Sequence, residues 1–169
     1  MKTRVLQVLR VLLILSLTGA CARSAAPVPL SSSFDTKEAA AQAALDAVWT
    51  RDSAALGRLS ITQTEFQKHI WPQLPASAPD VGMPVGRAWA DHLMKDDGFR
   101  AQLIAEHGGR RLMLESIRFN GRPTTYGGFT IHPDTRVTVF DRDQRLELRL
   151  WGSMIESGGR WKIYSFIVD

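Results

Sequence analysis

The chain has 169 residues and a formal net charge of +4, from 21 Lys and Arg against 17 Asp and Glu. Three of the basic residues and none of the acidic ones lie in positions 1–20, so the remainder carries only 18 − 17 = +1. This balance argues against a nucleic-acid binder, which usually shows a basic patch or stripe. The single cysteine, Cys21, excludes an intramolecular disulfide and a cysteine-based zinc site.

Residues 1–20 have the pattern of a secretory signal peptide. A basic start with Lys2, Arg4 and Arg10 precedes an apolar run over residues 11–17, and small residues follow. That run is too short for a membrane-spanning helix, which needs about 20 apolar residues. The chain is therefore expected to be anchored to a membrane and not threaded through it.

The segment 17–21, with the sequence LTGAC, resembles the lipobox of bacterial lipoproteins. The resemblance implies that the thiol of Cys21 is diacylated, that the peptide is cut before it, and that the new amino group is acylated. Stable anchoring takes more than one acyl chain. Ala22 stands where an Asp would retain such a protein at the inner membrane, so the resemblance implies the outer membrane and its periplasmic face.

Three regions are predicted along the chain. Residues 1–20 form the signal peptide, and residues 21–33 form the lipidated cysteine and a flexible tether of small residues, serines and prolines. Residues 34–169 form one domain, which is large enough to bury a core.

The domain begins with helical signals. The capping pattern of residues 35–38 predicts a helix over about 36–50, and Asp52 can cap a short helix through Leu59. Thr62 and Glu65 form a second capping box, for a helix that should end at residue 71 because Pro72 follows. A loop with four prolines spans residues 72–84. Residues 85–107 return to helical spacing, with Leu93 on the expected core face.

From residue 110 onward the apolar period changes to two, which predicts strands. The candidates are residues 112–119, 129–131, 135–140, 145–157 and 161–168. Turns are expected at Asn120-Gly121, at residues 141–144 and at Gly158-Gly159. Helices followed by a meandering antiparallel sheet predict an α+β domain, with the N-terminal helices packed on a curved sheet.

This order resembles the nuclear transport factor 2-like, cystatin-like fold. The resemblance rests on ALDAVW at residues 44–49 followed by RDSAAL at 51–56, and on the closing segment GGRWKI at 158–163. It implies a cone, in which a curved sheet wraps around a long helix. The proline-rich segment before the last helix departs from the family pattern at the mouth of that cone.

Asp91 and His92 are the strongest local candidates for chemistry. A carboxylate can orient an imidazole that moves protons near neutral pH. Isomerases and dehydratases of the resembled fold place such groups inside the cone. Adjacent helical residues point about 100° apart, however, so the commoner arrangement has Asp91 in solvent and His92 at the core edge.

Tryptophans offer a second kind of candidate, because indole rings line ligand pockets as well as cores. Trp89, His92, Trp151 and Tyr164 are the residues expected to line an apolar cavity if the cone is open. The four histidines lie far apart in the sequence and show no metal-ligand spacing, so no metal and no cofactor is expected.

Three functions stay open at the level of the sequence. The first is a non-enzymatic domain that binds a small apolar ligand or an envelope protein, without nucleic acid. The second is a small isomerase or dehydratase that uses Asp91 or His92 in a cone pocket. The third is an accessory subunit of an envelope complex. A filled cone with an exposed apolar patch would favour a protein partner.

Overall fold

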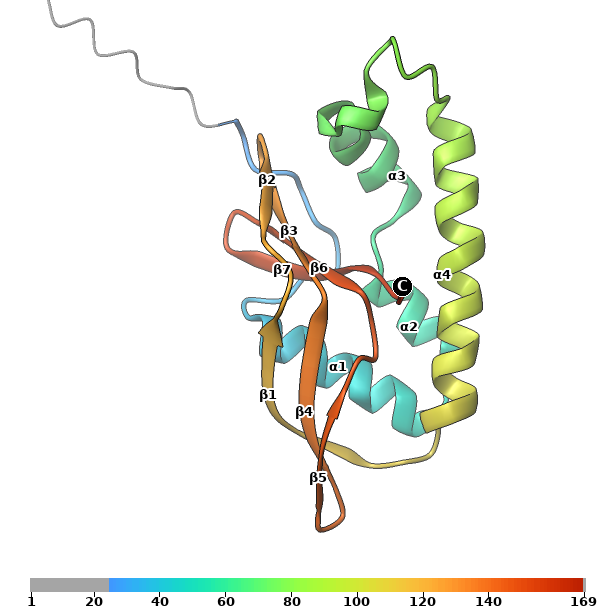
Figure 1. The fold of residues 1–169 in the computed structure, drawn as a ribbon, viewed down its shortest axis with the longest axis vertical. Coiled ribbons are helices and arrows are strands. Elements are labelled where there is room, and N and C mark those ends of the chain that lie inside the picture. Colours follow the sequence, from blue (N-terminus) through green and yellow to red (C-terminus); the bar gives the residue numbers. More distant parts are fainter. Residues whose placement is uncertain (1–24, 169) are drawn as a thin grey trace, which may run out of the picture.

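A computed structural model describes residues 25–168 of the chain. Cys21 and the predicted signal peptide lie outside the described residues. The helices come first and the strands follow, which confirms the predicted α+β class (Figure 1). The helical elements are α1 (Lys37–Thr50), α2 (Ser53–Leu59), α3 (Gln63–Glu65), the π-helical turn η1 (Phe66–Ile70), the 3-10 turns η2 (Trp71–Gln73) and η3 (Pro75–Ser77), and α4 (Val85–His107).

Side-chain caps define the starts of the first three helices, although the first cap is Thr36 and not Asp35, which begins the predicted capping pattern. Thr36 Oγ1 accepts a hydrogen bond from Ala39 N at 3.1 Å, and Asp52 Oδ1 accepts one from Ala55 N at 2.8 Å. At α3, Thr62 Oγ1 accepts from Glu65 N, and the Glu65 carboxylate accepts from Thr62 N at 2.7 Å. These side chains satisfy backbone donors that a helix start leaves unpaired.

The third helix differs from its prediction. Only three residues are α-helical, and the chain then widens into the π-helical turn η1, where Trp71 N donates to Phe66 O. Pro72 has no N–H to continue the α-helical ladder, so a regular helix cannot run through it. The chain tightens into η2 instead, and Leu74 N donates to Trp71 O at 3.0 Å.

Within the described residues, seven strands pair antiparallel in two sheets. The three-stranded sheet has the order β1-β4-β5, and the four-stranded sheet has the order β2-β3-β6-β7. Their bounds are β1 Leu112–Phe119, β2 Thr124–Tyr126, β3 Phe129–Pro133, β4 Thr135–Asp141, β5 Gln144–Leu148, β6 Ser153–Ser157 and β7 Arg160–Ser165.

Long segments of chain run from one sheet into the other. Strands β3 and β4 are separated only by Asp134, whose φ of 51° turns the chain. The single strand predicted over 145–157 is interrupted at residues 149–152. These residues join β5, the partner of β4, to β6, the partner of β3. The segments β3–β4 and β5–β6 therefore each place one strand in each sheet, with a bend between the two strands.

The turn predicted at Asn120-Gly121 is not a hairpin. Strand β1 pairs with β4 and β2 pairs with β3, so residues 120–123 carry the chain past the bend without reversing it. A Cβ at Gly121 would lie 2.6 Å from Cγ of Pro133, so this position needs glycine for close packing. The turns predicted at residues 141–144 and 158–159 do close hairpins.

Two apolar cores lie on opposite faces of the four-stranded sheet. Successive residues of a strand point to opposite faces, and Met154 accordingly belongs to the first core and Ile155 to the second. The first core packs α1, α2 and the C-terminal half of α4 against both sheets. The second lies between the four-stranded sheet and the segment that runs from α3 to the N-terminal half of α4.

Residues 25–34 lie along the four-stranded sheet, and we name them the N-terminal strap. Val28 is buried, and its carbonyl accepts a hydrogen bond from Ser157 Oγ at 2.9 Å. Phe34 and Trp161 exchange two backbone hydrogen bonds of 2.8 Å. The described part of the predicted tether, residues 25–33, is thus packed on the domain.

Candidate functional site

Three of the four residues predicted to line a cavity meet in the second core. The ring of His92 lies 5.5 Å from that of Trp89 and 5.8 Å from that of Tyr164, measured between centroids. Phe66 of η1 stacks on His92 at 5.9 Å and touches Trp89 at 5.4 Å. We name Phe66, Trp89, His92 and Tyr164 the aromatic cluster. Its rings come from η1, α4 and β7 and pack against each other.

The other candidates lie elsewhere. Trp151 is fully buried in the first core, where its ring meets Phe166 edge-on at 6.5 Å. Asp91 faces solvent on the outer side of α4, with its carboxylate 3.9 Å from the Arg87 guanidinium. Asp91 and His92 therefore point away from each other, as neighbours on a helix must, and do not form a pair for proton transfer.

The cluster shifts the pKa values of its two titratable members. Burial lowers the pKa of His92, and the Asp96 carboxylate one turn along α4 offsets part of that shift. Burial raises the pKa of Tyr164 to about 12, with a smaller contribution from Tyr126. Both groups are consequently neutral at pH 7, and the imidazole and phenol behave as parts of a packed aromatic core.

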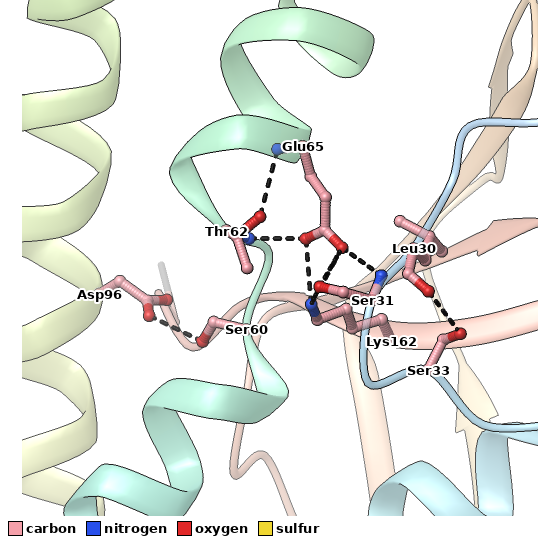
Figure 2. A network of polar contacts seen from close by, with 8 residues as sticks. All are labelled: Leu30, Ser31, Ser33, Ser60, Thr62, Glu65, Asp96 and Lys162. Carbon is pink, nitrogen blue, oxygen red and sulfur yellow. Dashed lines mark hydrogen bonds and ion pairs between the residues drawn. The ribbon is translucent and has the colours of Figure 1, made fainter.

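A buried ion pair lies in the same core (Figure 2). Lys162 Nζ on β7 donates to the two carboxylate oxygens of Glu65 at 3.0 and 3.2 Å, and neither side chain is more than 5% exposed. The Oγ of Ser31 in the strap donates to the same carboxylate at 2.8 Å. Glu65 thus joins α3, β7 and the strap at one point, besides closing its own capping box.

The hydrogen bonds decide the charge state of this pair. Burial alone would raise the pKa of Glu65, but hydrogen bonds from Thr62, Lys162 and Ser31 outweigh it and hold the pKa below its usual value. Burial lowers the pKa of Lys162, and the bonds to Glu65 oppose that shift. A carboxylate with several donors around it stays ionised, which keeps the lysine charged beside it.

Asp96 forms a second buried polar junction, at the middle of α4. Its carboxylate accepts hydrogen bonds from Ser60 Oγ at 3.0 Å and from Phe166 N at 2.6 Å. Arg100, one turn further along α4, lies with Nε 3.2 Å from the same carboxylate. Asp96 therefore fastens α4 to the end of α2 and to the chain after β7, and Figure 2 shows its bond to Ser60.

The sequence offered weak signals for these polar residues. Glu65 was recognisable only as a helix cap, and Asp96 only as one of two adjacent carboxylates before Gly98. Lys162 stands out in hindsight, because it shares a face of β7 with Tyr164 and lies next to the core residue Ile163. Which carboxylate would meet that lysine depends on folding, since Glu65 lies 97 positions away.

One hollow of about 210 Å³ lies between the C-terminal half of α4 and the chain after β7. Apolar side chains of Phe99, Leu103 and Phe166 line it together with polar His107 and Arg149. Burial and the neighbouring Arg110 lower the pKa of His107. This hollow does not include any member of the aromatic cluster.

Exposed apolar side chains occur on the outer side of α4 and in the loop before it. Met94 is 68% exposed and Leu93 is 39% exposed, although Leu93 was expected to face the core. In the loop, Val81 is 52% and Met83 is 43% exposed. Exposed apolar side chains occur elsewhere too, at Trp49 and Met113.

Residues 25–168 contain no group of three or more His, Cys, Asp or Glu side chains placed to hold a metal ion. Within the same residues, no helix has the length and apolar character needed to cross a membrane. Comparisons of the chain with protein-family models, with curated proteins and with solved structures found no match.

Proposed function

We propose that this chain is a lipoprotein anchored through Cys21 to the outer membrane, with a periplasm-facing domain that binds another protein and has no catalytic role. The observation that carries the second half of the proposal is the contrast between the two sides of α4. The inner side is filled by the aromatic cluster, whereas the outer side presents Leu93 and Met94 to solvent.

The geometry around His92 favours binding over catalysis. Rings of Phe66, Trp89 and Tyr164 surround the imidazole at centroid distances of 5.5 to 5.9 Å. Asp91, next to it in the chain, faces solvent. Asp96, one turn along α4, has its carboxylate bound to Ser60 Oγ and Phe166 N. An isomerase or dehydratase would need a proton-transfer group next to space for a substrate, so the enzyme is the weaker alternative.

The nuclear transport factor 2-like cone belongs to the same proposal. The bends between β3 and β4 at Asp134, and between β5 and β6 at residues 149–152, support the cone, because such bends curve a sheet around the helices. The interior of this cone would be filled by the aromatic cluster and the ion pair of Glu65 and Lys162. A filled cone would act as a rigid support for residues on its outside, as an accessory subunit of an envelope complex requires.

The anchor is tested by replacing Cys21 with Ser. The C21S chain should incorporate no labelled fatty acid and, after signal cleavage, should be released when membranes are washed. A cleaved C21S chain that stays with washed membranes would contradict the anchor.

The binding surface is tested with a photo-crosslinking amino acid at position 94 in growing cells. We expect a discrete adduct with a second protein, and its loss when Leu93 is also changed to Ser. The matched control is the same amino acid at position 143, an exposed site in the turn after β4. If position 94 gives the same adducts as position 143, the outer side of α4 is not a binding surface.

A further inference from the structure

The strap fixes the point at which the preceding chain reaches the domain. Ala25 lies at the turn between β2 and β3, where a Cβ at Gly127 would be 3.4 Å from that of Ala25. Pro27 lies at the turn between β6 and β7, where a Cβ at Gly158 would be 3.1 Å from Cβ of Pro27. The strap thus enters between two hairpin turns at one end of the four-stranded sheet.

Little chain separates this point from the predicted anchor. Four residue steps lead from Cys21 to Ala25, and an extended chain spans at most about 3.4 Å per residue, or about 14 Å in all. A tether of this length cannot let the domain turn freely above a bilayer. The end of the domain that carries the two turns must stay near the lipid, provided that Cys21 bears the proposed anchor.

The tip of β2, beside which the strap enters, lies at the same end of the long axis as a loop with exposed apolar residues (Figure 1). Figure 1 shows the loop before α4 and the tip of β2 at one end of the long axis, with the hairpin of β4 and β5 at the other. Val81 and Met83 lie in that loop, 52% and 43% exposed, between Pro79 and Pro84. Prolines restrict the loop backbone, so these side chains are presented at a low cost in conformational entropy.

We propose that this end is a membrane-facing surface, and that Val81 and Met83 enter the bilayer interface when Cys21 is lipidated. The proposal rests on the proposed lipid anchor and adds an orientation to it. The partner is the lipid itself, because the short chain keeps the strap near a bilayer, and the loop with Val81 and Met83 lies at the same end of the long axis as the tip of β2 (Figure 1). Residues 78–84 contain one charged side chain, Asp80, so the contact is apolar and should be insensitive to salt.

The orientation has a consequence for the other surface. With its N-terminus near the lipid, α4 points away from the membrane along the length of the domain (Figure 1). Its 23 residues correspond to about 34 Å. Leu93 and Met94 would then be presented above the bilayer, where a partner in the periplasm can reach them.

The test uses the full lipidated chain, reconstituted into vesicles of phosphatidylethanolamine and phosphatidylglycerol. Met83 is changed to Cys and labelled with an environment-sensitive dye, and quenching by spin-labelled lipid is measured. We expect at least a twofold quenching and a blue-shifted emission, both unchanged in high salt. The control is the same label on Asp143→Cys at the opposite end of the domain, for which we expect no quenching.

The outcomes separate the orientation from the anchor. If the chain floats with the vesicles and the label at position 83 is quenched no more than the label at 143, the orientation is wrong and the anchor stands. If the chain does not float with the vesicles, the anchor fails and the orientation fails with it. A second label at Val81→Cys guards against a local effect of the first, and it must give the same result as position 83.

Discussion

The two cores of this domain are built from different kinds of side chain. The buried residues of the first are mostly aliphatic, with Trp151 and Phe166 as the aromatic exceptions, and small residues such as Ala40, Ala41 and Ala44 let α1 approach the sheet closely. The second is rich in aromatic rings and also encloses the ion pair of Glu65 and Lys162. The first is held mainly by hydrophobic burial, with Asp96 fastening α4 at its edge, whereas the second encloses an ion pair whose charged groups must find each other.

The difference indicates a division of roles. Apolar packing tolerates volume-conserving changes, but a buried charge without its partner is strongly unfavourable. The second core also lies beside the strap, and it is the region that connects the predicted anchor to the rest of the domain. The predictions below compare the two cores, beginning with the largest expected effect.

Removing one member of the ion pair should have the largest effect. Glu65→Leu leaves the Lys162 ammonium buried with only Ser31 Oγ nearby, at 3.4 Å, and should lower the free energy of unfolding by about 3–5 kcal/mol. The measurement is urea denaturation. The double variant Glu65→Leu with Lys162→Met should recover most of the loss, and a double variant as unstable as the single one would show that the charge is not the cause.

Truncation in the first core should cost somewhat less and depend on no charge. Leu45 is fully buried in α1, and Leu45→Ala should lower the free energy of unfolding by about 3 kcal/mol, since it leaves a cavity. The loss should be equal at pH 7 and pH 5 in denaturation experiments. If the loss of unfolding free energy caused by Leu45→Ala differed between the two pH values, the first core would also depend on a titrating group.

His92 should make the second core sensitive to acid. Its folded-state pKa lies below the usual value near 6.5, so the unfolded chain takes up a proton first as the pH falls. Stability should therefore decrease as the pH drops below about 6.5 towards the folded pKa. His92→Phe should reduce this decrease, as measured by denaturation at several pH values.

His107 provides the control for that experiment, because burial and Arg110 lower its pKa as well. His107→Gln should remove a separate part of the acid sensitivity. If His92→Phe has the same pH dependence as the natural chain, the imidazole is not titrating in the aromatic cluster.

The smallest effect is expected outside both cores. Met94→Ser on the outer side of α4 should change the free energy of unfolding by less than about 0.5 kcal/mol, because the side chain is mostly exposed. The same variant should reduce recovery of the proposed partner when the chain is purified from intact envelopes. A large loss of stability would show that this side of α4 packs against the domain.

The sequence predicted the first core better than the second. Alternating residues such as Val137 and Val139, and the caps Asp52 and Thr62, are local signals from which the helices, the strands and their order could be predicted. The second core depends on contacts between distant residues, such as Glu65 with Lys162. No local pattern encodes such a pair, so the ion pair could not be predicted.

Three of the predicted site residues, Trp89, His92 and Tyr164, do come together, since helical and strand periodicity placed each on an inward face. Trp151 belongs to the other core. It lies in residues 149–152, where the predicted strand is interrupted, so strand alternation does not determine its direction. Leu93 lies at the edge of the apolar face of α4, next to His92, and its side chain is 39% exposed. These errors arise where chain geometry, and not composition, sets the direction of a side chain.

The bend at Asp134 has a consequence for the way the domain comes apart. The ribbon formed by β3 and β4 contributes Phe129 to the second core and Val137 to the first. Because β3 and β4 are consecutive in the chain, displacing either strand from its core should disturb the other core. The domain should therefore unfold in a single cooperative reaction. Native-state hydrogen exchange should find one common protection factor for the amides on both sides of Asp134, and not one value for each core.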